Sequence, residues 1–217
     1  MIFADRREAG RRLAHELSDY QGQNAIVLAL PRGGVIIGCE VARALDLALD
    51  VIITRKIGAP GNPEYAIGAV SEDGDVQFNE KEIAILGIPE AYVREEVAVQ
   101  RRETERRTLL YRAGRGLPDL AGRVVVLVDD GIATGFTVLA TIRALRSHSP
   151  AEIVLAVPVA PPSVVLALRP EVDKVACLAT PEPFMAVGAW YRHFEQVSDE
   201  EVRACLEDCR QQPINPQ

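Results

Sequence analysis

The sequence predicts an α/β protein with a doubly wound, mostly parallel sheet and a small C-terminal hood. Short apolar segments of strand length alternate along the chain with helix-like segments, which is typical of a parallel sheet joined by crossover helices. Glycine-rich or charged turns follow several of these strands. The length of 217 residues suits one such domain with an appendage, whereas two full domains would be cramped.

The first half of the chain begins with a covering helix. Asp5 and Glu8 form a capping box ahead of an amphipathic segment that reaches about Tyr20. Hydrophobic runs, turn residues and helical periodicity then predict the following elements: a strand at 25–30, a turn at 31–34, a helix at 35–45, a strand at 49–54, a hairpin of 66–71 with 76–78, and a long charged helix at 89–111. The charged part of that helix, 94–107, is expected to be a solvated face or a contact in a homodimer.

The second half repeats the alternation of strand and helix. Strands are expected at 124–128, 153–157 and 175–178, and helices at 137–146, 163–168 and 198–209. We therefore expect four regions: a core over 1–180, an insertion within it at about 56–112, a hood with a C-terminal helix at 181–210, and a disordered tail at 211–217.

The composition is that of a soluble globular protein, with 48% hydrophobic and 25% charged residues and a net charge of −7. An acidic balance gives no general attraction to nucleic acid or to anionic membranes, so neither is an expected partner. No apolar run has the length of a membrane span, and the first residues lack the apolar stretch of a signal peptide. These features predict a cytoplasmic protein.

The four cysteines do not form a paired zinc pattern. Cys39 and Cys177 lie in apolar segments and are expected in the core. Cys205 and Cys209 are one helical turn apart, where a metal or redox role and a purely structural role both remain open.

The most informative segment is Val124–Thr137, in which an apolar strand ends in two adjacent acids, Asp129 and Asp130. Open α/β sheets bind ligands in the crevice outside the carboxyl ends of their strands. The turn Gly-Ile-Ala-Thr-Gly-Phe-Thr follows the acids and opens a helix, so its glycines, hydroxyls and N–H groups favour a phosphate. The segment therefore predicts a ligand with an anion at one end and hydroxyls or a metal at the other.

Two further turns carry positive charge at strand ends. In Pro31-Arg32-Gly33-Gly34 the glycines allow close approach of the backbone and Arg32 offers a bidentate fork, a combination that suits a pyrophosphate. Arg55 and Lys56 emerge at the end of the next strand, where they either offset a diphosphate or are solvated surface charges. The glycines and prolines after them predict a hinged lid.

The strand, the two acids and the loop Gly-x-Ala-Thr-Gly-x-Thr resemble the phosphoribosyl pyrophosphate (PRPP) motif of the type I phosphoribosyltransferases. The resemblance covers about 25–180, and it is to stand-alone bacterial phosphoribosyltransferase-like proteins whose acceptor is unassigned. It implies a pentosyltransferase of nucleotide metabolism that uses PRPP, Mg²⁺ and a small-molecule acceptor. In such a reaction the phosphoribosyl group moves to the acceptor and pyrophosphate leaves.

The resemblance also implies roles for individual residues. Asp129, Asp130 and Arg32 are the expected catalytic residues, with the two acids holding the ribose hydroxyls and reaching the metal through those hydroxyls or water. Pyrophosphate is expected at Arg32, Gly33, Gly34 and Lys56. The 5-phosphate is expected at Gly131, Ile132, Ala133, Thr134, Gly135, Phe136 and Thr137.

The acceptor is less well defined by the sequence. Phe184, Trp190 and Tyr191 lie where family members carry a hood over a flat base, although these rings could equally pin the C-terminal helix to the core. Enzymes for 6-oxopurines commonly carry an aspartate at the position of Ala133, which disfavours a hypoxanthine or guanine acceptor. Two alternatives to a transferase remain: a regulator that binds PRPP or a nucleotide with reduced turnover, and a phosphoribosyl-handling hydrolase, for which the sequence offers no water-activating group.

Overall fold

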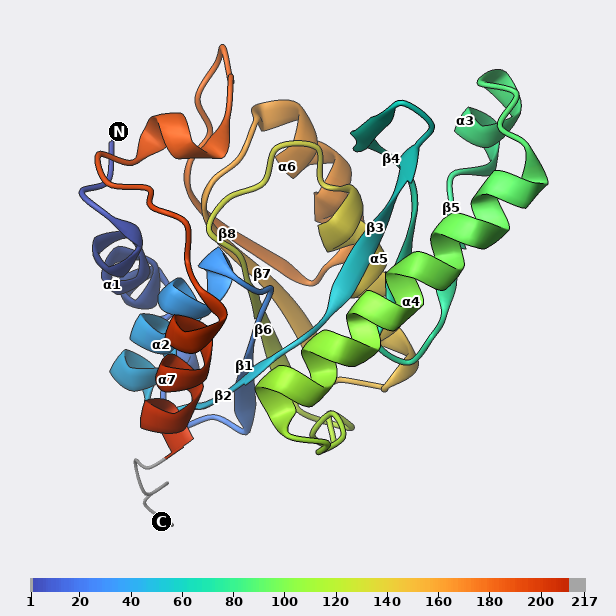
Figure 1. Cartoon of the computed structure of the whole chain (residues 1–217). Helices are drawn as coiled ribbons and strands as arrows, with labels where there is room; N and C mark the ends of the chain where they lie inside the picture. The colour runs from blue at the N-terminus through green and yellow to red at the C-terminus, as the bar shows by residue number, and fades with distance from the viewer. Residues whose placement is uncertain (1, 211–217) are drawn as a thin grey trace. The chain divides into compact units, whose positions relative to one another are not determined.

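A computed structural model describes residues 2–210, so the expected disordered tail lies outside the described residues (Figure 1). The chain divides into two compact units. The second unit consists of Ile53–Leu117 and Phe136–Ser147, and the first unit comprises the rest of the chain.

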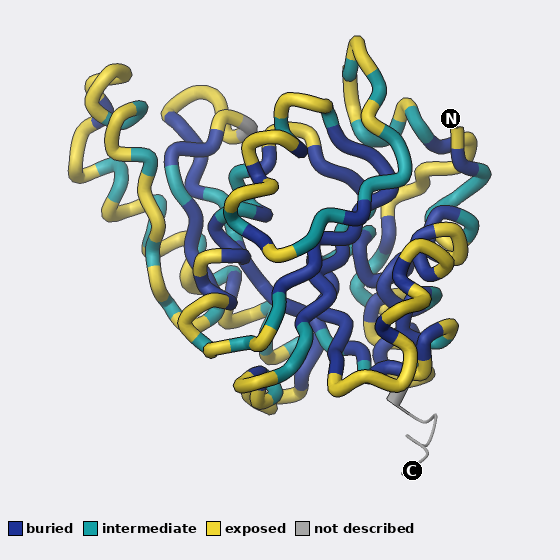
Figure 2. Tube along the Cα trace, turned by 180° about the vertical axis from the view of Figure 1, so that it is seen from behind, coloured by how far each residue is buried: buried dark blue, intermediate teal, exposed yellow. Residues whose placement is uncertain are grey.

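The first unit is built on a five-stranded parallel sheet, as the sequence predicts. Its strand order is β2-β1-β6-β7-β8, and every neighbouring pair runs parallel. The strands are β1 (Ala25–Ala29), β2 (Ala48–Val51), β6 (Val124–Val128), β7 (Glu152–Val159) and β8 (Lys174–Ala179). The three central strands are the most buried: β1 throughout, and β6 and β7 after their first residue, as the dark blue strands at the centre of Figure 2 show. The outer strands β2 and β8 are only partly buried. Burial on both faces explains why the central strands consist of apolar runs rather than alternating residues.

Three helices of this unit lie together beside the sheet (Figure 1). They are α1 (Arg6–Glu16), α2 (Gly33–Leu45) and α7 (Asp199–Arg210). Asp5 caps α1 by accepting a hydrogen bond from the Glu8 N–H at 2.8 Å, as the capping-box pattern predicts. The remaining helical segments of the unit are shorter: η1 (Ser18–Tyr20), α6 (Pro162–Leu168), η2 (Arg169–Glu171) and η3 (Val187–Trp190).

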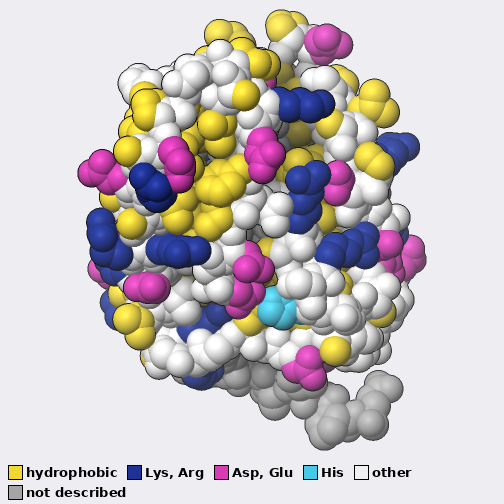
Figure 3. Space-filling view, turned by 90° about the vertical axis from the view of Figure 1, so that its right-hand side faces the viewer, with side chains coloured by type: hydrophobic (Ala, Val, Ile, Leu, Met, Phe, Trp, Pro, Cys, Tyr) yellow, Lys and Arg dark blue, Asp and Glu magenta, His cyan; other side chains and the backbone are white. Residues whose placement is uncertain are grey.

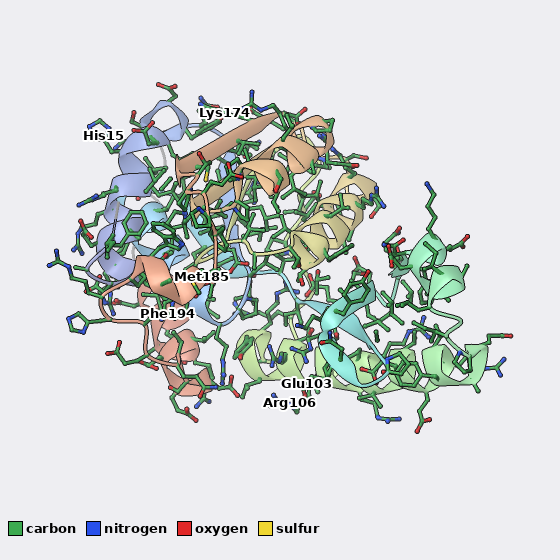
Figure 4. The ribbon with its side chains drawn as sticks, turned by 90° about the horizontal axis from the view of Figure 1, so that it is seen from above. His15, Glu103, Arg106, Lys174, Met185 and Phe194 are labelled. Atoms are coloured by element: carbon green, nitrogen blue, oxygen red, sulfur yellow. The ribbon has the colours of Figure 1, made fainter. Side chains whose placement is uncertain are left out.

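The second unit contains a three-stranded antiparallel sheet in the order β3-β4-β5. Its elements are β3 (Thr54–Ala59), β4 (Asn62–Ser71), β5 (Val76–Phe78), α3 (Glu80–Ile85), α4 (Glu90–Arg112) and α5 (Phe136–Ser147). A small core around Ile57, Ile67 and Val70 holds the unit together. Figure 4 labels Glu103 and Arg106 on α4, which form one of that helix's ion pairs at 2.8 Å.

The structure corrects the expectation for the segment after β2. The strand predicted at 49–54 ends at Val51, and the glycine- and proline-rich stretch predicted to make a hinged lid is not a loop but the paired β3–β4 hairpin. Gly61 lies in its turn at φ +72°, a backbone conformation that glycine adopts without a steric penalty. Because β3 begins with three polar residues and ends with a glycine and an alanine, its sequence lacks the continuous hydrophobic run of a core strand.

Among residues 2–210, no helix combines the length and the apolar character that crossing a bilayer requires.

Basic and acidic side chains are interspersed over the face of the molecule that Figure 3 shows.

Candidate active site

The candidate site lies where the order of the parallel strands reverses. From β1 the chain moves to β2 on one side, and it later returns to β6 on the other side of β1. Ala29 and Val128, the last residues of β1 and β6, are partners in the register, so the two strands end at the same level. A crevice at such a switch point is the usual ligand site of open α/β sheets.

The loops that leave β1 and β6 are in direct contact. The Leu30 N–H donates to the Val128 carbonyl at 2.9 Å, and the following peptide bond between Pro31 and Arg32 is cis. A Cβ placed on Gly34 would lie 2.9 Å from the Val128 oxygen and 3.0 Å from the Asp129 Cα. Only glycine fits such an approach of two backbones. The structure thus brings Gly33 and Gly34 against the acid pair, as the strand-end argument predicts.

Asp129 and Asp130 form an electrostatically strained pair. The Asp130 N–H donates to Asp129 Oδ1 at 2.8 Å. Burial, and then the neighbouring Asp130 carboxylate, raise the pKa of Asp129 well above its usual value. Burial also raises the pKa of Asp130, and the Arg6 guanidinium acts in the opposite direction by favouring the charged carboxylate. The site therefore concentrates acid groups that gain from a cation or from hydroxyl donors.

Two residues from distant parts of the chain hold Asp130 in place. Arg6, on α1, donates from Nε to Asp130 Oδ2 at 2.8 Å. Its guanidinium also lies 3.8 Å from the centroid of the Phe194 ring, and Figure 4 labels Phe194 in the segment before α7. Tyr191 donates its hydroxyl hydrogen to the Asp130 carbonyl at 2.5 Å. One oxygen of the Asp130 side chain is thereby paired, and its backbone is fixed.

Two glycines shape the loop after the acids. Gly131 and Gly135 both have positive φ, at +156° and +80°. The Ile132 N–H is fixed to the Val159 carbonyl at 2.9 Å, whereas Ala133 and Thr134 are exposed. Helix α5 begins at Phe136, directly after Gly135, so the unpaired N–H groups of a helix N-terminus follow the loop without a break.

The cations predicted for the diphosphate have different surroundings. Arg32 is partly exposed at the start of α2, with Nη1 3.9 Å from Asp199 Oδ1. Lys56 lies on β3 of the second unit, opposite Ala69 in the register. Arg55 donates to Gln100 of α4 at 3.1 Å, and burial lowers its pKa, so it belongs to the packing of that unit. Of the three, Arg32 is the one that shares a loop with Gly33.

The aromatic residues predicted for the acceptor fall into two groups. Phe184 and Trp190 stack on each other, with ring centroids 6.3 Å apart. Tyr191 is buried between Phe3 and Phe194, at centroid distances of 5.5 and 5.0 Å. Its burial fits the alternative that these rings have a packing role, predicted as pinning the C-terminal helix to the core, whereas Phe184 and Trp190 remain the predicted acceptor residues.

Sequence reasoning missed Arg6 and the hydroxyl of Tyr191. Arg6 appears in the sequence as one of many charged residues on an amphipathic helix, and its partner lies 124 positions away. No local pattern marks such a contact. The one available signal was the capping box, which fixes where α1 begins and so places Arg6 in its first turn.

Comparison with known proteins connects this geometry to a family. A family model for the phosphoribosyl transferase domain matches residues 4–181. Proteins from two strains of Mycobacterium tuberculosis, whose names contain the words phosphoribosyl transferase, are 44% identical over 206 residues. The match covers 95% of this chain and 46% of each relative, so the chain spans about half the length of the curated relatives it matches.

Solved structures agree with the fold. A protein from Thermus thermophilus has 43% sequence identity and a TM-score of 0.81, with 96% of this chain and 99% of that chain covered. A Neisseria gonorrhoeae protein with bound ppGpp shares the fold at 14% identity and a TM-score of 0.51, with 96% and 94% covered. The predicted α/β fold and the family resemblance are confirmed: the chain belongs to the phosphoribosyltransferase family.

Proposed function

We propose that this chain transfers the 5-phosphoribosyl group of PRPP to a small-molecule acceptor with a nucleobase-like nitrogen and releases pyrophosphate, with Mg²⁺ as the metal. The observation that carries the proposal is the contact of the acid pair with the Arg32-Gly33-Gly34 loop at the switch point. That contact puts carboxylates for a ribose beside a backbone turn for a diphosphate. The acidic, apolar-cored composition supports a cytoplasmic enzyme with small-molecule partners.

In the proposed reaction the chain mainly positions its substrate. The N–H groups and hydroxyls from Gly131 to Thr137 hold the 5-phosphate, and Asp129 and Asp130 accept hydrogen bonds from the ribose hydroxyls. Arg32 stabilises the negative charge that develops as the bond between the anomeric carbon and the pyrophosphate oxygen breaks. The acceptor nitrogen then forms its bond to the same carbon, which has oxocarbenium character. No covalent intermediate with the protein is needed.

The residues present fit a magnesium ion that is shared with the substrate. Among the residues whose side chains the structure describes, no group of three or more His, Cys, Asp or Glu could hold a metal ion on its own. Mg²⁺ usually keeps several waters and binds substrate phosphates, and Asp129 and Asp130 would reach it through the ribose hydroxyls or through water. When bound, the ion would offset the charge of the diphosphate.

The acceptor is proposed to lie against Phe184 and Trp190, whose stacked rings offer a face for a flat base. Lys56 is proposed as a further cation for the pyrophosphate. Ala133 removes the aspartate that 6-oxopurine enzymes commonly carry at this position, so pyrimidine and pyridine acceptors should be assayed alongside purines.

The direct experiment mixes the protein with PRPP, Mg²⁺ and single purine, pyrimidine or pyridine bases and measures pyrophosphate release. We expect release with at least one acceptor and none without it. Asp130→Asn should lower the rate at least about 10-fold, because one of the two ribose-binding charges is lost. Asp119→Asn is the matched control, since this aspartate lies in the loop before β6 and accepts a hydrogen bond from the nearby Ala121 N–H at 3.0 Å.

Calorimetric titration with PRPP, together with the release assay, distinguishes a transferase from a PRPP-binding regulator and from a hydrolase. Tight binding without release for any acceptor would contradict the transferase and support a PRPP-binding regulator. Release of pyrophosphate without an acceptor would instead indicate a hydrolase. Equal rates for the Asp130→Asn and Asp119→Asn variants would contradict the role given to the acid pair.

A further inference from the structure

Three of the four cysteines gather between α2 and α7, away from the acid pair. Cys39 is fully buried in the middle of α2, and Cys205 and Cys209 lie one turn apart on α7. The Sγ atoms of Cys39 and Cys209 are 2.7 Å apart, although 170 positions separate them in the sequence. The Cys39 thiol also lies 3.7 Å from the Cys205 carbonyl oxygen.

We propose that Cys39 and Cys209 are a redox-active pair that forms a reversible disulfide between α2 and α7 under oxidising conditions. An S–S bond is about 2.05 Å long, so the two sulfur atoms need to move by less than about 1 Å to form it. Figure 1 shows the two helices side by side, and their backbones are in contact in the first unit. No folding change is needed for the bond to close.

A cation lies beside the pair. Among the residues whose side chains the structure describes, no cluster of His, Cys, Asp and Glu has a metal-binding arrangement. The cation is Arg43, which is in ion pairs with Glu40 of its own helix and Asp208 of α7. Cys209 is only partly buried, so a small oxidant can reach its sulfur from the surface.

The electrostatics give the two sulfurs different roles. The hydrogen bond from Cys39, and then the charge of Arg43, lower the pKa of the Cys209 thiol against the opposing effect of burial. For Cys39, Cys205 acts to lower the pKa, but the hydrogen bond with Cys209 and burial outweigh it and raise the pKa to about 12. Cys209 is therefore the sulfur that reacts first, and Cys39 is the resolving thiol.

The chemistry balances with a peroxide as the oxidant. The Cys209 thiolate attacks one peroxide oxygen, the O–O bond breaks, and with one proton taken up the products are a Cys209 sulfenic acid and water. The Cys39 sulfur then attacks the Cys209 sulfur, the S–O bond breaks, and a second water leaves with the proton of Cys39. In total two thiols lose two electrons and two protons, and hydrogen peroxide becomes two waters. An added dithiol reverses the change by thiol–disulfide exchange.

The test treats the full chain with hydrogen peroxide, removes the excess, denatures the protein and counts free thiols. We expect four thiols before treatment, since the sequence has four cysteines, two after it, and four again after addition of a dithiol. Peptide mapping without reductant should recover Cys39 joined to Cys209. The closed bond constrains a long stretch of the unfolded chain and should raise the melting temperature by about 5–15 °C.

Two variants make the assignment specific. Cys209→Ser should abolish both the loss of thiols and the rise in melting temperature. Cys177→Ser should change neither, because Cys177 lies on β8 and bonds the Ala179 carbonyl. Four thiols after peroxide, a linkage through Cys205, or oxidation of Cys209 to sulfinic acid without a disulfide would overturn the proposal. Because every readout is independent of PRPP, failure here leaves the proposed transferase activity untouched.

Discussion

Replacing Gly33 with alanine should disable the site through a single steric conflict. An alanine Cβ at this position would lie 2.6 Å from the Asp130 Cγ, closer still to its Oδ2, and 2.8 Å from the Arg6 Nε. Non-bonded carbon atoms prefer separations of about 3.5–4.0 Å, so the carboxylate must move by about 1 Å or more. The movement breaks the hydrogen bond between Arg6 and Asp130, which measures 2.8 Å in the native chain.

The size of the effect follows from two losses. Overpacking of this kind typically costs about 1–3 kcal/mol, and a hydrogen bond between charged groups contributes about 1.5–3 kcal/mol. Gly33→Ala should therefore lower the free energy of unfolding by about 3–5 kcal/mol. Since one of the carboxylates that we propose to hold the ribose is displaced, the affinity for PRPP should fall by about 10- to 100-fold.

Urea unfolding and calorimetric titration with PRPP and Mg²⁺ measure the two effects. Gly116→Ala is the control, because a Cβ there meets no atom within 4 Å and the backbone φ is not positive. A second alanine in place of Asp130 removes the group that clashes, so Gly33→Ala should cost much less stability in that background while PRPP binding stays weak. Native stability and affinity in the Gly33→Ala variant, or an equal stability cost in both backgrounds, would refute the reasoning.

Three further predictions concern single groups. The pKa of Asp129 is raised in the folded state, so above about pH 4 the folded chain binds more protons than the unfolded chain, and its stability falls as the pH rises toward the folded pKa. Asp129→Asn should remove the contribution of this group to the loss of stability. The variant should therefore be more stable than the native chain at about pH 7.5 but not at about pH 3.5, as measured by urea unfolding at both pH values. Glu72→Gln should lower the free energy of unfolding by about 1.5–3 kcal/mol, because the buried Arg112 guanidinium loses the charge of the carboxylate that lies 2.8 Å away. Tyr191→Phe should cost about 1–2 kcal/mol by the same measurement, since the Asp130 carbonyl loses its 2.5 Å donor.

Matched variants on exposed groups serve as controls for these changes. Glu90→Gln removes one partner of the exposed pair with Arg94 and should shift stability by less than about 0.5 kcal/mol. Tyr65→Phe removes a hydroxyl that bonds Glu82 at the surface and should have an equally small effect. An identical pH dependence in Asp129→Asn and the native chain, or equal costs for Glu72→Gln and Glu90→Gln, would show that burial does not control these groups.

The parallel sheet was predictable because each of its strands carries a local signal. Val124–Val128 is a continuous apolar run that ends in two acids, and a strand buried on both faces requires such a run. β3 was not predictable in the same way. Its residues include Arg55 and Lys56, and it is stabilised by pairing with β4 and by the core around Ile57, so the decisive interactions lie outside its own sequence.

The site shows the same division between local and long-range information. The Gly-x-Ala-Thr-Gly-x-Thr loop and its preceding acids form one continuous segment, so the sequence predicts their chemistry directly. The position of the Asp130 carboxylate depends on three contacts from elsewhere: Arg6 near the N-terminus, the close approach of Gly33, and Tyr191 beyond β8. Cys39 is a similar case, because its sequence surroundings predict a core residue, which it is, while its neighbour Cys209 is visible only in the folded chain.

Because of these long-range contacts, substitutions outside the motif are expected to affect the site. A change at Arg6 or Tyr191 alters no residue of the motif, yet it changes the charge or the support of Asp130, the one acid of the pair whose side chain is in an ion pair with a described residue. We therefore expect that an intact motif is not by itself sufficient for PRPP binding. If Arg6 is replaced by methionine, the positive charge that opposes the rise in the pKa of Asp130 is lost, so the pKa should rise further and PRPP binding should need a higher pH. A titration of PRPP affinity against pH in Arg6→Met and native protein measures that shift, and unchanged profiles would show that the motif alone determines the charge of the site.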